Sequence, residues 1–199
     1  MENEQIKKIN LTYLLGYIFL PIIFCIICFI IGAIFFKKGT MAVILFMIPP
    51  FLSVIWWTFG GKIIYKKKQK EFEEELDKTN FKRNQTFYAN GSMVVVDVEN
   101  GKIGYLSFFN PTKTYIIPAN RITKIWVDDG KSGVGFMAGS SRVSFLFKVD
   151  DVKIRVNTFT SNQRWRMDSD YILTGISKAD MMAEIIEEAK KNSNKEKNK

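Results

Sequence analysis

The stretch 11–36 reads LTYLLGYIFLPIIFCIICFIIGAIFF and contains no charged residue. A second apolar run, 41–61, follows a short connection that contains Lys37 and Lys38. A helix needs about 20 mostly apolar residues to cross the hydrocarbon core of a bilayer, so each run is long enough to span it. A cleaved signal peptide has a shorter apolar region and no second span close behind it. The sequence therefore predicts a transmembrane hairpin at the start of an α+β membrane protein.

The lysines that flank the two runs predict how this hairpin is oriented. Lys and Arg close to the ends of a span are retained in the cytoplasm. Residues 1–10 contain Lys7 and Lys8, and a larger group follows the second run: Lys62, Lys66, Lys67, Lys68 and Lys70. We therefore expect a multi-pass protein of the bacterial inner membrane, with both termini in the cytoplasm and residues 1–10 as a cytoplasmic lead. The five lysines after the second run are candidate contacts with anionic lipid headgroups, each contributing roughly 1 kcal/mol.

The segments on either side of the remaining domain have helical or disordered character. Residues 62–80 favour a helix with a basic first half and an acidic second half, and we expect a largely solvated linker there. The alternative is that Phe72 and Leu76, at positions i and i+4, rest against the domain or a second copy of this helix. From Ser177 to about Lys190, one apolar stripe is surrounded by charged residues, which predicts an amphipathic helix. Residues 191–199 are polar and basic throughout, so we expect a disordered tail.

Between these segments, residues 85–190 show the pattern of an antiparallel β-domain that ends in the helix. Asn100-Gly101 is a strong hairpin-turn signal that separates two strand-like runs. Two alternations of apolar and polar residues, 143–149 and 152–158, flank a turn at Asp150-Asp151. They predict a hairpin with one buried face and one wet face, because successive side chains of a strand point to opposite sides.

Six or seven short antiparallel strands closed by one amphipathic helix resemble the pleckstrin-homology (PH) architecture. The likeness rests on the order of four features: the Asn100-Gly101 turn, a Pro118-led turn into a strand, the hairpin at 150–151 and the closing helix. It is greatest to small bacterial PH-like domains attached to a two-helix membrane hairpin. The resemblance implies an antiparallel β-barrel or sandwich with a C-terminal helix. It also implies a non-enzymatic scaffold that binds a protein partner or an anionic lipid.

The domain order also resembles that of bacterial antiphage effectors activated by cyclic nucleotides. Some of these proteins have two N-terminal spans and a small C-terminal β-barrel that binds the nucleotide. This second resemblance implies a cyclic-nucleotide ligand, self-association of the spans and membrane disruption in antiviral defence. A third hypothesis is an exclusion or immunity factor of a mobile element, which would act on a membrane-spanning transfer apparatus.

The residue types present argue against an enzyme. The chain contains no histidine, the commonest general base and metal ligand, so Ser-His-Asp and Cys-His arrangements are excluded. The two cysteines, Cys25 and Cys28, lie in the first apolar run without a second pair that would complete tetrahedral metal ligation. We therefore expect no catalytic residue, no cofactor and no metal site.

A glycine-rich segment is the first candidate binding site. Residues 130–139 read GKSGVGFMAG and contain Lys131 and Ser132, two residue types that occur together in phosphate-binding loops. The spacing is not that of a P-loop, and a strand rather than a helix is predicted after it. We expect a loop between strands that forms a binding lip of the domain.

The second candidate is NQRWR at 162–166, where Trp165 lies between Arg164 and Arg166. An aromatic ring between two guanidinium groups can stack on and pair with a phosphate or an acidic partner. The alternative is that Trp165 covers the edge of the core and that the two arginines beside it are solvated. The net charge of +9 is otherwise scattered along the chain without a nucleic-acid-binding pattern. Partners are therefore expected to be the bilayer, a protein or a second copy, and not nucleic acid.

Overall fold

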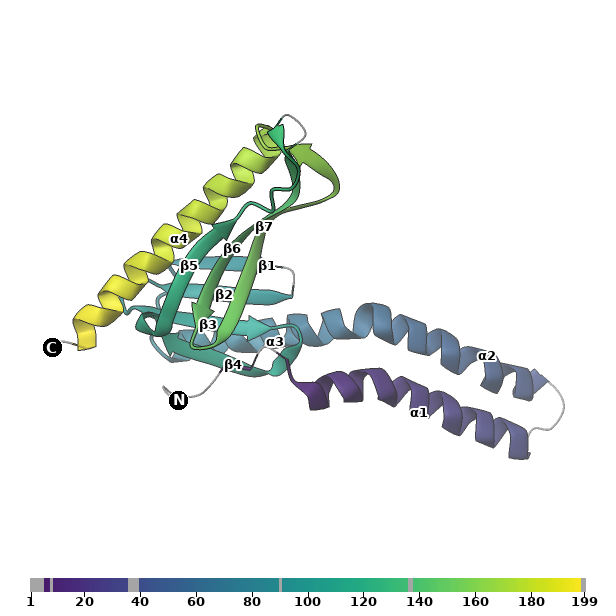
Figure 1. The fold of residues 1–199 in the computed structure, drawn as a ribbon. Helices are drawn as coiled ribbons and strands as arrows, with labels where there is room; N and C mark the ends of the chain where they lie inside the picture. Colours follow the sequence, from purple (N-terminus) through teal and green to yellow (C-terminus); the bar gives the residue numbers. More distant parts are fainter. Residues whose placement is uncertain (1–5, 8, 36–39, 90, 136–137, 198–199) are drawn as a thin grey trace.

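The computed structural model describes every residue except 1–5, 8, 36–39, 90, 136–137 and 198–199. Two helices project from a β-rich domain as an antiparallel hairpin (Figure 1). They are α1 (Leu11–Phe35) and α2 (Thr40–Ile55). A π-helical turn, η1 (Trp56–Gly60), joins α2 to α3 (Gly61–Lys78). One helical rod therefore runs from the tip of the hairpin into the domain.

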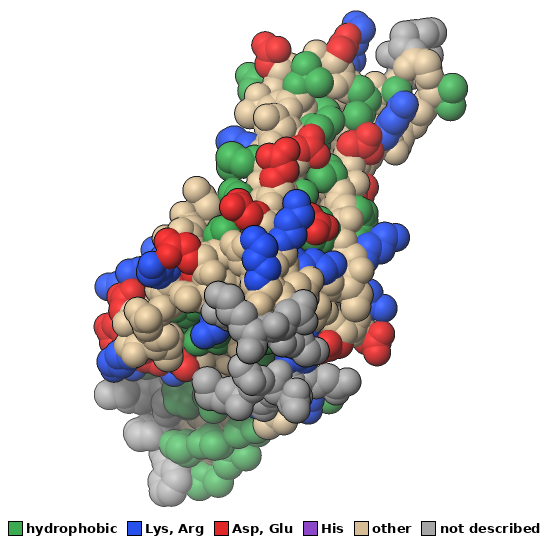
Figure 2. Space-filling view, turned by 90° about the vertical axis from the view of Figure 1, so that its left-hand side faces the viewer, with side chains coloured by type: hydrophobic (Ala, Val, Ile, Leu, Met, Phe, Trp, Pro, Cys, Tyr) green, Lys and Arg blue, Asp and Glu red, His purple; other side chains and the backbone are tan. Residues whose placement is uncertain are grey.

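The hairpin exposes apolar side chains over most of its surface. The segments Leu11–Ile34 and Phe46–Lys78 are both long and apolar enough to cross a membrane. Only 6 % of the most apolar window of α1 is buried, so α1 is not the core helix of a soluble fold. In Figure 2 hydrophobic side chains gather at the lower edge, where the hairpin lies, whereas the upper part of the visible face mixes charged, polar and hydrophobic side chains. An exposed apolar surface of this extent indicates contact with lipid or with another apolar partner.

Ser53 connects the two helices of the hairpin near their prolines. Its hydroxyl donates to the carbonyl oxygen of Pro49 (2.9 Å) and lies 3.2 Å from the Cys25 Sγ of α1. The bond to the carbonyl four residues earlier satisfies a hydroxyl that would be costly to leave unpaired in an apolar medium. Cys25 and Cys28 are both free thiols. Cys25 therefore serves as a helix-to-helix contact here.

The domain consists of two antiparallel sheets built from successive hairpins. The first sheet has the order β1-β2-β3-β4, with strands β1 (Gln85–Ala89), β2 (Ser92–Asp97), β3 (Lys102–Ser107) and β4 (Asn110–Pro118). The second sheet has the order β5-β6-β7, with strands β5 (Ile122–Asp128), β6 (Gly139–Val149) and β7 (Val152–Arg166). The strands predicted from periodicity are confirmed, and so is the C-terminal helix. The two sheets cross in Figure 1, with β5–β6–β7 in front.

The described strands do not close into the barrel that was one of the two predicted forms. β4 and β5 are not hydrogen-bonded neighbours, and a 3-10 turn, η2 (Ala119–Arg121), separates them. Pro118, the last residue of β4, has no N–H with which to continue a ladder, so the chain leaves the first sheet there. The domain is thus a pair of open sheets within an α+β protein.

Two apolar clusters hold the four-stranded sheet on its two faces. The larger cluster lies between the two sheets and α4, and its members include Val94, Tyr105, Phe145, Phe147 and Ile186. The smaller cluster lies between the first sheet and α3, and it contains Phe72, Leu76, Phe81, Met93, Val95 and Leu106. Phe72 and Leu76 are fully buried. The prediction of a solvated linker over 62–80 is therefore wrong, because α3 supplies one layer of the core.

The C-terminal helix, α4 (Asp170–Lys197), begins earlier than predicted. Gly175 lies inside it because the helix approaches β7 closely there: a Cβ at this position would be 2.8 Å from the Cβ of Phe159. Ile172 and Ala179 are buried on either side of this glycine, so the apolar stripe starts before Ser177. α4 runs alongside the β5–β6–β7 sheet (Figure 1).

The same helix also ends later than predicted. The Asn192 side chain donates its Nδ2 to the carbonyl oxygen of Val98 (2.9 Å), and Ser193 is buried against Gly101. These contacts fix the end of α4 on the turn between β2 and β3. The prediction of a disordered tail over 191–199 is wrong as far as Lys197, and the last two residues lie outside the described part of the chain.

Replacing Phe72 tests whether α3 belongs to the core. We expect Phe72→Ala to lower the free energy of unfolding by about 3–5 kcal/mol, because it leaves a cavity under the sheet. The measurement is urea denaturation of the full-length protein in detergent micelles, followed by tryptophan fluorescence. Glu74→Ala, on the exposed side of the same helix, is the matched control and should change stability by less than about 0.5 kcal/mol. A similar small change for Phe72→Ala would contradict the packing of α3.

Candidate binding surface and membrane junction

The sheet β5–β6–β7 has one face in the core and one open face, as the alternation predicted. Val143, Phe145 and Phe147 of β6 point inward and are fully buried. The outer face is formed by the alternate residues of β6, which point the other way, and by the residues of β5 and β7 that pair with them. This outer face is mostly polar and charged, and one end of it holds the candidate residues.

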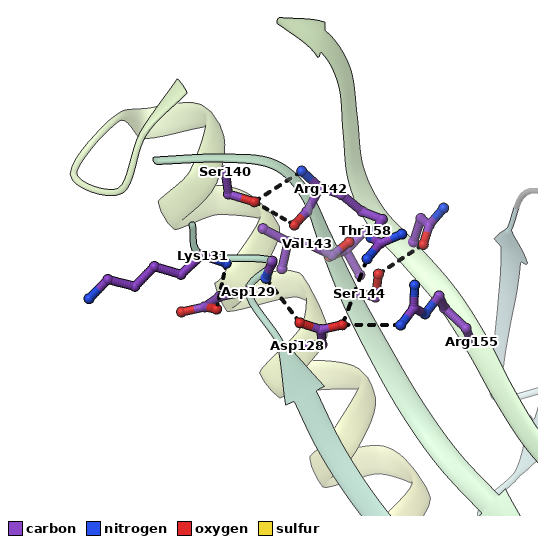
Figure 3. A network of polar contacts seen from close by, with 11 residues as sticks. Asp128, Asp129, Lys131, Ser140, Arg142, Val143, Ser144, Arg155 and Thr158 are labelled. Carbon is purple, nitrogen blue, oxygen red and sulfur yellow. Dashed lines mark hydrogen bonds and ion pairs between the residues drawn. The ribbon is translucent and has the colours of Figure 1, made fainter. Parts of the chain in front are cut away.

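A carboxylate on this face holds its three strands together (Figure 3). Asp128, at the end of β5, accepts a hydrogen bond from the Arg155 Nη2 of β7 (3.1 Å) and one from the Gly130 N–H (3.0 Å). The Arg142 Nη2 of β6 is 4.0 Å from the same carboxylate. Beside it, the Ser144 hydroxyl donates to the Asn157 Oδ1 (2.9 Å). Asp128 therefore pairs with two arginines and fixes the start of the following loop.

The glycine-rich segment is a loop whose base is closed by hydrogen bonds. The Lys131 N–H donates to the Asp129 Oδ1 (3.0 Å), and Ser132 and Gly139 exchange two backbone hydrogen bonds of 3.0 and 3.1 Å. Lys131 and Ser132 are both exposed. Residues 136–137 of the predicted lip lie outside the described residues. The Lys131 side chain extends away from the network in Figure 3 and is open to solvent.

The segment NQRWR lies in the last part of β7 and comes next to this loop. Gly139 pairs with Arg166 and Ser140 pairs with Trp165, so the two candidate segments share one end of the sheet. The Arg164 Nε donates to the carbonyl oxygen of Gly139 (3.3 Å). The structure therefore brings together Lys131, Ser132 and the Arg-Trp-Arg segment, which are about thirty positions apart in the sequence.

Trp165, however, is engaged by the protein itself. Its ring packs against Tyr171 of α4, with 4.5 Å between centroids, and its Nε1 donates to the Ser161 hydroxyl (3.1 Å). Arg166 forms an ion pair with Asp168, with 2.8 Å between the Arg166 Nη2 and the Asp168 Oδ2. An incoming anion would thus meet Arg164 and Lys131, both exposed, and not a free indole face.

A different tryptophan on the outer face was missed from the sequence. Trp126 of β5 is half-buried, and the ammonium groups of Lys124 and Lys153 lie 5.2 and 5.0 Å from its ring centroid. Lys153 comes from β7, two strands away, so the pair depends on strand register and not on spacing in the sequence. The alternation at 152–158 predicts that Lys153 lies on the wet face of its strand. It cannot show that Lys153 lies beside Trp126.

The five lysines predicted at the membrane surface lie in the first ten residues of α3, directly after the hairpin. Lys62, Lys66, Lys67 and Lys70 are exposed, and Lys68 is half-buried. Lys67 and Lys68 are both ion-paired with Glu71 on the next helical turn. The five lysines together, at the point where the exposed apolar surface ends, are called the basic collar.

The two apolar helices and the β-domain meet at a junction formed by Tyr17, Gly61 and the β3–β4 turn. The Tyr17 hydroxyl lies 2.9 Å from the carbonyl oxygens of both Trp56 and Trp57 and accepts the Gly61 N–H (3.1 Å). These are backbone groups of the π-helical turn, where the regular α-helical bonding pattern is interrupted. Tyr17 therefore ties α1 to the rod at the point where α2 becomes α3.

The β3–β4 turn contacts both helices at this junction. Phe108 packs so closely against Gly61 that a Cβ there would be 2.9 Å from its Cζ. The carbonyl oxygen of Phe109 accepts the N–H of Asn10, which precedes α1. Phe108 also makes an edge contact with Tyr65, and burial raises the pKa of the Tyr65 hydroxyl. The domain is thus held to the hairpin by packed contacts and not by a flexible connection.

Nothing in the described part of the chain suggests a metal centre, since no group of three or more His, Cys, Asp or Glu side chains there could hold an ion. The fold and the surface thus define an α+β protein with two apolar helices and a two-sheet domain. Searches against protein-family models, curated proteins and solved structures return no match to this chain.

Asp128→Asn tests the network on the outer face. We expect a loss of about 1 kcal/mol in the free energy of unfolding, because two half-exposed arginines lose their counter-charge. Asp151→Asn removes a carboxylate that is 92 % exposed and paired with Lys148, so its effect should be too small to measure. Urea denaturation in micelles gives both values, and equal losses for the two variants would contradict the structural role of Asp128.

Gly61→Ala tests the junction. The added methyl group must push Phe108 away, so we expect faster amide hydrogen exchange in the β3–β4 turn, by about tenfold or more at Phe108 and Phe109. Gly16→Ala, in α1, is the matched control because a Cβ there meets nothing within 4 Å. Exchange is followed by mass spectrometry of the full-length protein in micelles. Unchanged exchange in Gly61→Ala would show that the turn is not clamped by the rod.

Proposed function

We propose that this chain is a non-enzymatic, membrane-anchored binding protein. Its hairpin spans the bacterial inner membrane with both termini in the cytoplasm, and its β-domain engages a protein partner or an anionic lipid beside the membrane. The observation that carries the proposal is the helical rod: its first part exposes apolar side chains, and its continuation α3 is buried under the sheet. An anchor built into the core of a domain keeps that domain at the membrane.

The basic collar supports this orientation. Lys62, Lys66, Lys67, Lys68 and Lys70 follow the apolar surface directly, where a cytoplasmic headgroup layer would meet them. Tyr13, Tyr17 and Trp56 lie close together at the same level of the hairpin. Aromatic side chains are enriched at this depth of a bilayer because they have an apolar body and a polar tip.

The strand order supports a PH-like binding scaffold. Two antiparallel sheets of four and three consecutive strands, followed by one helix along the second sheet, have the order expected for that architecture. The absence of histidine and of a described metal-binding cluster fits a scaffold that performs no chemistry. Specificity would then come from surface side chains.

The junction favours a second candidate, the effector that responds to a cyclic nucleotide by rearranging its spans. A signal of this kind needs a stiff connection between ligand and membrane, and Tyr17, Gly61 and Phe108 supply one. A thermal-shift assay of the full-length protein in micelles against a panel of cyclic nucleotides separates the two. A large shift with one nucleotide supports the effector, and no shift with any of them supports the binding scaffold.

The anchor is tested by fractionation and reporter fusions in bacterial cells. We expect the full-length protein to resist carbonate extraction and to dissolve only in detergent, because the exposed apolar side chains of the hairpin would otherwise face water. Green fluorescent protein at the C-terminus should fluoresce. Alkaline phosphatase should be active when inserted between residues 37 and 38 and inactive at the C-terminus. Recovery in the soluble fraction, or an active C-terminal phosphatase, would overturn the proposal.

A further inference from the structure

The outer face of β5–β6–β7 carries a row of lysines that strand register creates. Lys124 of β5 is opposite Lys148 of β6, and Lys148 is opposite Lys153 of β7. Three lysines therefore occupy neighbouring positions across the three strands of the sheet. Like charges directly opposite one another destabilise a sheet, so this row does not serve the stability of the fold.

Few carboxylates compensate this row. Lys148 pairs with Asp151, which is 92 % exposed, and such an exposed pair contributes little. Lys124 and Lys153 have no carboxylate partner among the described residues, and both lie over Trp126 instead. Asp128 is held by the two arginines at the other end of the face. The row thus keeps an unbalanced positive charge next to an aromatic ring.

The neighbouring row makes the site flat and partly apolar. Trp126 is opposite Leu146, and Leu146 is opposite Arg155. Leu146 is fully buried although it belongs to the outer face, so the two larger side chains cover it. Trp126 and the aliphatic part of Arg155 then offer apolar contact area beside the lysines. A flat surface with this composition suits a macromolecular partner better than a small ligand.

The bilayer that holds the hairpin is not the occupant of this face. In Figure 1 the sheet β5–β6–β7 turns its outer face to the viewer, whereas the hairpin extends within the plane of the picture. The outer face, which carries the lysine row, therefore points along the proposed membrane surface and not toward it. A nucleic-acid backbone is also a poor fit, because Asp151 lies beside the row and the remaining cations of the chain are scattered without a nucleic-acid-binding pattern.

We propose that this face, formed by Lys124, Trp126, Lys148, Lys153 and Arg155, binds an acidic helix of a partner protein. Neighbouring strands are about 4.8 Å apart, so the lysines repeat at nearly that distance. Side chains at positions i and i+4 of a helix lie about 5–6 Å apart, so carboxylates with this spacing match the row. This inference rests on the proposed function as a binding protein and specifies the surface and the chemistry of its partner.

The test uses the full-length protein in nanodiscs of zwitterionic lipid and a fluorescein-labelled peptide of Ala, Gln and Glu. One peptide carries glutamate at every fourth position, and the other has the same composition with its glutamates distributed around the helix. Fluorescence anisotropy should show that the patterned peptide binds at least about tenfold more tightly. Lys124→Glu/Lys153→Glu should weaken its binding by at least about tenfold.

The matched control is Lys178→Glu/Lys191→Glu, which changes two exposed lysines of α4 and gives the same net charge. It should bind the patterned peptide as the wild type does. Equal losses in the two double variants, equal binding of the two peptides, or no binding would overturn the inference. Stronger binding of an oligothymidine than of the patterned peptide would assign the face to nucleic acid instead. Because the protein stays in nanodiscs throughout, each negative result counts against this surface and leaves the membrane anchor untouched.

Discussion

The structure depends on one continuous helical rod that is formed by α2, η1 and α3. From Phe46 to Phe59 its side chains are mostly apolar and exposed, and from Gly61 onward it buries Phe72 and Leu76 under a sheet. Because the helix is continuous through the π-helical turn, the position of the domain relative to the hairpin is fixed by helical geometry. The β3–β4 turn then closes the same junction from the other side. The β-domain and the two apolar helices are therefore connected through packed contacts.

The features predicted from the sequence are those that local chemistry decides. Each apolar run is as long as a helix must be to cross a bilayer. The Asn100-Gly101 turn needs the left-handed backbone that Gly101 adopts, with a φ of +58°. The spacing of Phe72 and Leu76 allowed packing on the domain but did not decide between that packing and a solvated linker, and the full length of α4 could not be predicted. That length depends on contacts such as that of Asn192 with Val98, 94 positions away. The polar tail at 191–199 was predicted to be disordered because the residues that it contacts are distant in the sequence and no local pattern identifies them.

The candidate binding residues were predicted in part for the same reason. Composition identified Lys131, Ser132 and the Arg-Trp-Arg segment, and β6–β7 pairing brings these residues to one end of the sheet. Composition could not show that Trp165 packs on Tyr171, because the early start of α4 was not predicted. Nor could it show the lysine row, since alternation tells which face a residue is on and register tells which residues are neighbours. Trp126 gains its two lysines only through that register.

The most direct test of the account is whether lipid surrounds the hairpin. A variant with Trp126→Phe and Trp165→Phe retains only Trp56 and Trp57, which lie at the end of the exposed apolar surface of the rod. After reconstitution into vesicles whose acyl chains are brominated, its fluorescence should be strongly quenched relative to unbrominated vesicles. The converse variant, which retains only Trp126 and Trp165, should be unaffected. Unquenched fluorescence from Trp56 and Trp57 would contradict the account, because those side chains would then lie outside the bilayer.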